Sequence, residues 1–379
     1  MKHKLQRPKI PTSTQLRLWV LAAGRCEFQG CNDLLLHDDL TLSEGNYSNI
    51  SHIISWTPTG PRGDAVLSPK LAKDISNLML MCQKHAKLID DKKYIPFYTA
   101  EKLLMFKKMH EERIGIQTEI QAARKTLVLR LESNIRGRKV QVAQPDVYSA
   151  LLEAGRYPAD EKGVLIDLTG IKYAPDKAFW DTSARQIEAE LASAFRVGND
   201  GARHSHLSIF ALAPIPLLAY LGFRLGNTVP ADIYIKMRGR NWLLQQKTPR
   251  AQLSARRPKR ARGKHVALSI AISGSVSSSS IYKATGMRLP IYEIKIRRPG
   301  LDSIRSAEDL EVFRELYRSV MDEIRERHGK KARVHLLAAI PSCVAVVCGR
   351  EILHGVDPKV ILYEHGTQFS GFMPAITIN

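Results

Sequence analysis

The pattern of apolar and polar positions changes character about 160 residues into the chain. Before that point, apolar positions at helical spacing predict helices over residues 14–22 and 98–114. An apolar run at residues 49–54 predicts a strand, and the prolines and glycines of residues 58–63 predict a turn-rich loop after it. The first part of the chain therefore has the pattern of a small α+β unit.

Later in the chain, one succession of elements occurs twice. Apolar strands that end in a small polar residue and glycine lie at residues 163–170 and 265–274. An apolar strand, a proline and a small-residue helix that ends at glycine follow at residues 206–222 and 334–349. Amphipathic helices precede these second strands, at residues 183–195 and 307–328. A last strand closes each copy, at residues 232–236 and 360–363. Such alternation predicts parallel βα units buried on both faces, so two copies predict a pseudo-twofold pair of Rossmann-like halves.

These patterns predict three parts. We expect an N-terminal α+β unit at residues 1–115, a connector at residues 116–160 and an α/β domain at residues 161–379. Two apolar runs within the connector, residues 126–131 and 139–142, are expected to pair as a hairpin. The halves of the α/β domain are expected at about residues 161–250 and 264–379.

The carboxyl ends of the strands are the expected ligand site, because open parallel sheets bind ligands beyond those ends. Those ends carry Thr169-Gly170, Ala213-Pro214, Ser273-Gly274 and Ile340-Pro341. None of them forms a G-x-G-x-x-G fingerprint, so a dinucleotide redox cofactor is not expected.

Composition favours nucleic acid as a partner. The formal net charge is +20, which attracts a polyanion with or without a specific site, although a generally basic soluble protein is the alternative. No apolar run is long enough to span a bilayer, and no signal-peptide core follows the basic start, so no membrane partner is expected. The five cysteines form no paired framework, which favours a reducing, cytoplasmic location.

Four residues of the first part have the spacing of a zinc site. Cys26 and Cys31 form one pair, and Cys82 and His85 form a second pair about fifty residues later. Thiolates and a neutral imidazole are the usual ligands of a structural zinc, which supplies folding energy that a small hairpin lacks. The alternative is that these are reduced cysteines packed as small hydrophobic residues, with His85 on the surface.

Between the two pairs lie candidate catalytic residues. His52 falls in the predicted strand, and a neutral histidine at pH 7 suits a general base that takes a proton from water. In metal-dependent nucleases a divalent cation such as Mg²⁺ steadies the charge on the phosphate. Asn77 is expected to orient the active-site loop through hydrogen bonds. The alternatives are a core histidine for His52 and a helix N-cap for Asn77.

At these motifs the chain resembles a known family. The first part is similar to the HNH domain of bacterial defence nucleases through Arg25-Cys26 to Cys31, Ile50–Ile53, Gly60–Gly63, Asn77-Leu78, Cys82–His85 and Leu88–Asp90. The second is similar to a SAVED domain through Phe210–Pro214, Leu221-Gly222, Arg240, Trp242 and Gly349-Arg350. Together they resemble the HNH–SAVED effector endonuclease of CBASS antiphage systems. The resemblance implies that a cyclic oligonucleotide binds the SAVED domain and drives homo-oligomerisation, after which the HNH domains degrade double-stranded DNA.

A nucleotide pocket between the two halves follows from this resemblance, and a cyclic dinucleotide is the expected ligand. Residues 236–264 contain many lysines and arginines and no acidic residue. Arginine pairs with phosphate and an indole stacks on a base, so the first part of this stretch is expected to line the pocket. The later part, residues 250–264, is expected to form a loop that attracts DNA non-specifically. The expected pocket residues are Pro214, Arg238, Arg240, Trp242, Ser273 and Gly274.

Two positions depart from the common HNH pattern. Ser51 stands where an acidic residue often precedes the base, and Ala86 stands where a metal-binding histidine or asparagine often follows the last zinc ligand. Another anchor for the catalytic cation is then needed, and the acidic residues and histidine nearby in sequence are His37, Asp38, Asp39, Glu44 and Asp90.

Ala86 also supports a rival function. In that reading the HNH domain is degenerate or inactivated, and the chain is a sensor and scaffold that binds nucleotide and DNA without cutting. A second rival is a modification-dependent restriction nuclease whose C-terminal half reads DNA. The two Rossmann-like halves argue against it, because readers of bases seldom use that architecture.

Overall fold

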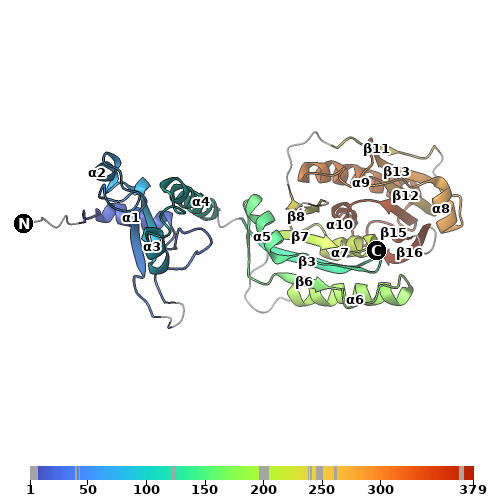
Figure 1. Cartoon of the computed structure of the whole chain (residues 1–379). Coiled ribbons are helices and arrows are strands. Elements are labelled where there is room, and N and C mark those ends of the chain that lie inside the picture. The colour runs from blue at the N-terminus through green and yellow to red at the C-terminus, as the bar shows by residue number, and fades with distance from the viewer. Residues whose placement is uncertain are drawn as a thin grey trace, which may run out of the picture. The chain divides into compact units, whose positions relative to one another are not determined.

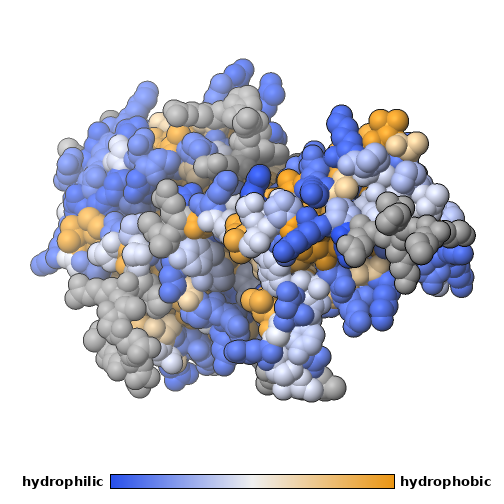
Figure 2. All heavy atoms as spheres, turned by 90° about the vertical axis from the view of Figure 1, so that its left-hand side faces the viewer, coloured by the Kyte–Doolittle hydropathy of each residue, from blue (hydrophilic) through white to orange (hydrophobic). Residues whose placement is uncertain are grey.

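The computed structural model describes residues 7–38, 41, 43–120, 124–195, 205–237, 239, 241–244, 251–259, 263–366 and 371–379. The chain divides into two compact units, Met1–Gln121 and Ala122–Asn379, each of which is described below by itself (Figure 1). The face shown in Figure 2 is largely hydrophilic, with apolar side chains scattered among polar ones. Among the described residues, no helix is both long and apolar enough to cross a membrane.

The first unit is built around a two-stranded antiparallel sheet. Its elements are α1(Thr12–Leu21), β1(Ser48–His52), α2(Leu67–Leu71), η1(Ile75–Asn77), β2(Leu78–Cys82), α3(Gln83–Asp90) and α4(Ala100–Glu119). The register pairs Ser48 with Cys82 and His52 with Leu78. The apolar residues of β2, from Leu78 to Met81, are buried in the core of the unit. Burial of this strand fixes the hairpin, and so places His52 at one end of the sheet and Cys82 at the other.

The second unit contains two sheets, of which the first is mixed. Its elements are β3(Lys125–Ile135), β4(Arg138–Val140), α5(Gln144–Glu153), β5(Tyr157–Pro158), β6(Val164–Asp167), α6(Lys177–Ala194), β7(Leu207–Leu212), α7(Ile215–Leu225) and β8(Ala231–Ile233), followed by a small pair of strands, β9(Ile235–Lys236) and β10(Trp242–Leu243). The sheet runs β4-β3-β7-β8, and β6 also pairs with β3 in parallel. Parallel pairing on both sides makes β3 the centre of this sheet.

The second sheet runs β11-β13-β12-β14-β15-β16. Its elements are β11(Leu253–Arg256), β12(His265–Ala271), α8(Ser278–Thr285), β13(Ile291–Ile296), α9(Ala307–His328), β14(Arg333–Ala339), α10(Ser342–Arg350), β15(Lys359–Gly366) and β16(Gly371–Ile378). The four inner strands are parallel, and the two edge strands are antiparallel to their neighbours. The pair of Rossmann-like halves expected from the repeated pattern is present, with mixed rather than purely parallel sheets.

The structure corrects the expected division of the chain. Residues 116–160 do not form a separate connector, because the boundary between the units falls after Gln121 and β3 is the central strand of the first sheet. The hairpin exists, but only residues 133–135 pair with β4. The preceding apolar residues of β3 pair with β6 and β7, since a strand that is apolar on both faces must be covered on both faces. The first half of the α/β unit therefore starts near Lys125 instead of residue 161.

The two halves pack together through α7 and α10 (Figure 1). We expected Gly222 and Gly349 to end these helices, but Gly222 lies within α7 and Gly349 is the second-last residue of α10. A Cβ atom on Gly222 would lie 2.2 Å from the carbonyl oxygen of Val346, and one on Gly349 would lie 1.8 Å from that of Ala219. Both glycines therefore serve close helix packing, because only a residue without a side chain fits at this crossing.

Candidate functional site

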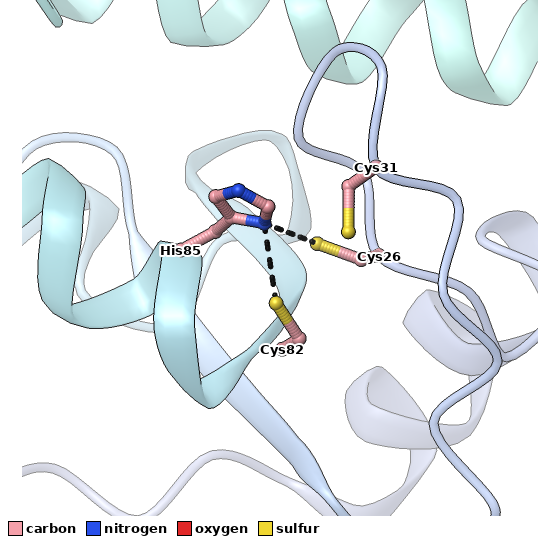
Figure 3. Close-up of side chains that lie close together, drawn as sticks. All are labelled: Cys26, Cys31, Cys82 and His85. Carbon is pink, nitrogen blue, oxygen red and sulfur yellow. Dashed lines mark hydrogen bonds between the residues drawn. The ribbon is translucent and has the colours of Figure 1, made fainter. Parts of the chain in front are cut away.

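The first unit brings together the four residues that the sequence singled out as zinc ligands. Cys26 and Cys31 lie in the segment after α1, Cys82 ends β2, and His85 lies in the first turn of α3. Their ligand atoms all lie within 4.8 Å of one another, and Figure 3 shows the four side chains converging. His85 Nδ1 lies 3.7 Å from Cys26 Sγ and 3.2 Å from Cys82 Sγ. In the described part of the chain, no other group of histidine, cysteine and acidic residues is arranged to hold a metal ion.

The donor set and its dimensions fit a tetrahedral zinc ion. Zinc–sulfur bonds of about 2.3 Å and zinc–nitrogen bonds of about 2.0 Å would place neighbouring ligand atoms about 3.5–3.8 Å apart. Burial raises the pKa of the Cys26 thiol to about 11 and also raises that of Cys31. A bound cation would offset this cost by stabilising the thiolates. Phe28 stacks on the His85 ring at 4.1 Å between centroids and so fixes its orientation.

A cavity of about 600 Å³ lies beside this cluster, at the junction of β1 and α3. It is lined by Arg7, Asn49, Ile50, Ser51, His52, Ser55, Trp56, Pro61, Gln83, Ala86, Lys87, Asp90 and Asp91. The cavity therefore contains the candidate base His52 together with Ser51 and Ala86, the two positions that depart from the common HNH pattern.

The surroundings of His52 keep its imidazole neutral and fix its tautomer. The side chain is only 7% exposed, and its Nε2 lies 2.9 Å from the carbonyl oxygen of Ala72. A carbonyl oxygen can only accept, so Nε2 carries the proton and Nδ1 has the lone pair. Burial lowers the pKa of His52 below 6.5, and the Arg7 guanidinium lowers it further. A neutral imidazole that keeps a lone pair on one ring nitrogen is what a general base requires.

Two side chains hold the loop that follows His52. The Asn77 amide donates to the carbonyl oxygen of Ile54 at 2.9 Å and accepts from the Ile54 N–H at 2.8 Å. Arg62 donates to the carbonyl oxygens of Ile53 and Ile89 at 2.6 and 2.5 Å, and to Asp90 Oδ1 at 2.6 Å. Asn77 thus makes contacts of the kind expected for a positioning residue. The role of Arg62 was not foreseen, because its partners come from two separate segments, the residues after β1 and the end of α3.

The cavity offers few ligands for a catalytic cation. Ala86 supplies none, and the acidic residues in the lining are Asp90 and Asp91. The segment between α1 and β1 contains His37, Asp38 and Glu44, none of which lines the cavity. Asp39 lies outside the described residues. Of the candidate cation ligands named from the sequence, Asp90 is therefore the one that lines the cavity among the described residues.

The structure contradicts the expected role of Trp242. The indole is only 1% exposed, and it packs edge-on against Phe210 at 5.3 Å between ring centroids, in a cluster that includes residues of α5. The Lys236 ammonium lies over the indole at 5.7 Å from the ring centroid, so the core and this cation together leave no face on which a base can stack. Arg238 and Arg240, the charges expected beside it, lie outside the described residues.

The remaining predicted pocket residues lie at the carboxyl ends of strands. Pro214 follows β7 and is the N-cap residue of α7. Ser273 and Gly274 follow β12, and the Ser273 N–H donates to the carbonyl oxygen of Ala339 at the end of β14. These positions agree with the sheet ends foreseen from the sequence, although none of the three residues lines either cavity described here.

One family model matches residues 189–378, the SMODS-associated and fused to various effectors sensor domain, abbreviated SAVED. The chain belongs to the SAVED family. The matched residues run from α6 to the end of β16. Strands β3 and β6 precede the match and lie in the same sheet as the matched strands β7 and β8.

Similar solved structures include SAVED/CARF-domain containing receptors called Cap4. The Acinetobacter baumannii receptor with the cyclic trinucleotide 2'3'3'-cAAA is 12% identical, with a TM-score of 0.43, and covers 83% of this chain and 66% of that chain. The same receptor with 3'3'3'-cAAA is 13% identical, with the same TM-score and coverage. The Moraxella osloensis receptor is 12% identical, with a TM-score of 0.43 and coverage of 81% and 66%. The chain thus spans 66% of the length of these receptors. Comparison with curated proteins gave no match.

A buried carboxyl in the SAVED domain escaped the sequence reasoning. Glu364 lies near the end of β15, is 7% exposed, and accepts a hydrogen bond from the Ile215 N–H at the start of α7. Among the described residues its Oε2 has no hydrogen-bond partner. Burial raises the pKa of Glu364 to about 7. Glutamate in a strand is not unusual in sequence, so only the packing of the two halves distinguishes this one.

The SAVED domain also has a cavity of about 530 Å³. Residues of the first turns of α6, Tyr220 of α7 and residues 373–377 of β16 line it. No residue that the sequence singled out for ligand binding lies there, and its mixture of apolar and charged side chains does not specify a ligand.

Proposed function

We propose that this chain is a nucleotide-gated DNA endonuclease of antiphage defence. In this proposal a cyclic oligonucleotide binds the SAVED domain, the chain oligomerises, and the N-terminal unit acts as an HNH domain that cleaves double-stranded DNA. The observation that carries the nuclease part is His52, a buried neutral imidazole in a cavity of about 600 Å³ beside a cluster of zinc-ligand residues. The net charge of +20 supports DNA as the polyanionic partner.

His52 would act as the general base. Its Nδ1 takes a proton from a water molecule, the water oxygen attacks the phosphorus, and the bond to the departing sugar oxygen breaks. The departing oxygen takes a proton from solvent. The bond from Nε2 to Ala72 keeps the lone pair on Nδ1, and Asn77 and Arg62 hold the loop that follows the base.

Two metal sites belong to this proposal. Zinc on Cys26, Cys31, Cys82 and His85 would fasten the segment after α1 to the start of α3. A divalent cation such as Mg²⁺, when bound, would neutralise charge on the phosphate, with Asp90 and substrate oxygens as its ligands. One carboxylate is few for such a site, so most of the ligands would come from the substrate and water.

The proposed ligand is a cyclic oligonucleotide, and a cyclic dinucleotide remains the expectation from the sequence. Support comes from the family, a sensor domain fused to various effectors, and from the paired sheets whose strand ends carry Pro214, Ser273 and Gly274. Trp242 is no longer part of this proposal because it is buried in the core.

Cleavage of plasmid DNA in the presence of Mg²⁺ and a panel of cyclic di- and trinucleotides tests this function. We expect cleavage with one ligand and none without ligand. Calorimetry on the same panel separates binding from cleavage, and light scattering reports oligomerisation. A panel member that binds tightly and yet causes no DNA cleavage would remove the nuclease from the proposal.

Ala86 favours one alternative, a sensor and scaffold whose HNH domain binds DNA without cutting it. The cavity has only Asp90 and Asp91 as acidic residues, which is consistent with a weak cation site. Ligand-dependent retention of DNA in a gel, with the DNA intact after prolonged incubation with Mg²⁺, is the result that would support this alternative.

A further inference from the structure

Arg7 has an unusual position in the cavity of the first unit. Its Nη2 donates to the carbonyl oxygen of Ile50 at 2.5 Å and lies 3.5 Å from His52 Nδ1. His52 Nε2 is protonated against Ala72, so Nδ1 can only accept. The Arg7 guanidinium therefore covers the lone pair that the proposed reaction needs.

Both contacts of Arg7 are to uncharged acceptors, and the contact to His52 is long. A guanidinium forms much stronger, bidentate bonds with a phosphate than with a neutral imidazole. The other cationic side chain in the cavity lining is Lys87. Arg62, which is close by, is already engaged by Ile53, Ile89 and Asp90. Arg7 is thus the guanidinium of the cavity that can exchange its partners at low cost.

We propose that Arg7 binds the scissile phosphate of DNA and that, in leaving His52 Nδ1 for a phosphate oxygen, it exposes the catalytic base. This inference rests on the proposed nuclease function. It explains how a cavity with few cation ligands can still hold an anionic substrate. It also couples the two events, because the lone pair of His52 becomes free when a phosphate is present to receive the guanidinium.

The test compares Arg7→Ala, Arg7→Lys and the control Arg17→Ala, since Arg17 is exposed on α1 and does not line the cavity. Binding of a short DNA duplex is measured without added Mg²⁺ and without a chelator, so that no cleavage is needed and the zinc site is left intact. We expect Arg7→Ala to weaken binding by about tenfold or more, the range for a hydrogen bond to a charged group. Loss of one phosphate contact should also lower the slope of log affinity against log salt by about 1. Arg7→Lys should fall between Arg7→Ala and the parent, and Arg17→Ala should match the parent.

A second readout tests whether Arg7 lies beside His52 in solution. NMR titration of His52 should show a higher imidazole pKa in Arg7→Ala, because the neighbouring cation is gone. Unchanged DNA affinity and salt slope in Arg7→Ala would overturn the inference. If Arg7→Ala loses DNA binding but the parent cleaves no DNA with any cyclic nucleotide, the nuclease proposal fails while the phosphate contact stands.

Discussion

At the scale of single residues, one hydrogen bond fixes the tautomer of the base that we propose. His52 is held by the carbonyl oxygen of Ala72, which can accept but not donate, so the tautomer is fixed by the backbone. Burial lowers the pKa of the imidazole and keeps it neutral near pH 7. His52 is the last residue of β1, so its side chain is largely buried and still lines the cavity.

His52→Ala should abolish most DNA cleavage. Loss of a general base typically lowers the rate by about 10²–10⁴-fold, while cyclic nucleotide binding and zinc content should stay unchanged. In the parent, a base whose pKa is lowered from 6.5 is neutral at pH 7, so cleavage should decline only at more acidic pH. A plasmid cleavage assay from pH 5 to 8 measures both effects. Cleavage at the parental rate by the variant would exclude His52 from the mechanism.

Glu364 supports a prediction about stability and pH. Its pKa is raised from 4.5 to about 7, so between these values the folded state holds a proton that the unfolded state has released. Stability therefore falls as the pH rises through this window, and above it the buried carboxylate is a penalty. Glu364→Gln should raise the melting temperature of the second unit more at pH 8 than at pH 5.

Thermal unfolding of Glu364→Gln at both pH values, with the exposed Glu315→Gln on α9 as control, checks this prediction. The control variant should show the same small effect at both pH values. A Glu364→Gln variant that is destabilised more at pH 8 than at pH 5 would contradict the prediction, because it would mean that the charged carboxylate stabilises the interface between the halves.

At the scale of secondary-structure elements, the crossing of α7 and α10 joins the two halves of the SAVED domain. Each helix carries a glycine at the point where the other helix approaches most closely. Arg350, at the end of α10, adds a hydrogen bond of 2.7 Å to the carbonyl oxygen of Val229 in the first half. The repeated strand–proline–helix pattern therefore builds two elements that pack against each other.

Gly222→Ala should destabilise the second unit. The added methyl group would meet the Val346 carbonyl oxygen, and overpacking of this kind costs about 1–3 kcal/mol. Gly115→Ala is the matched control, since Gly115 lies in α4 and a Cβ atom there meets no atom within 4 Å. That control should gain about 0.5–1 kcal/mol, because alanine favours a helix over glycine. Urea unfolding of both variants measures the difference, and a neutral Gly222→Ala would mean that the helices can separate freely.

At the scale of the whole molecule, the chain consists of two units that each have their own hydrophobic core. The first unit has a small core, and its zinc-ligand cluster joins the segment after α1 to β2 and α3. The second unit buries two sheets and the helices between them, and its described residues include no cluster of metal-ligand side chains. Loss of the metal should therefore affect only the first unit.

Cys82→Ala should remove zinc and unfold the first unit while the second remains folded. We expect elemental analysis to find one zinc per chain in the parent and none in the variant. Limited proteolysis should then degrade residues before about Gln121 and leave the SAVED domain intact. A folded parent chain that contains no zinc would contradict this prediction.

The sequence by itself determined the features that depend on local spacing. The two pairs of zinc-ligand residues could be recognised because the members of each pair lie close together in sequence. His52 could be recognised because it lies in a short predicted strand between the two pairs. The repeated strands and helices of the SAVED domain were visible because apolar periodicity is a local property of each element. The connector was misjudged because the pairing of β3 with β6 and β7 involves residues far apart in sequence.

Only the tertiary structure decided which polar and aromatic side chains are exposed to a ligand. Trp242 lies in a basic stretch of sequence and is nevertheless buried against Phe210, because strand β10 turns it into the core. Arg7 reaches His52 across 45 positions of sequence, and Glu364 reaches α7 from the other half of its unit. Burial and contact between distant segments arise from the packing of the whole chain, so no local pattern can reveal them.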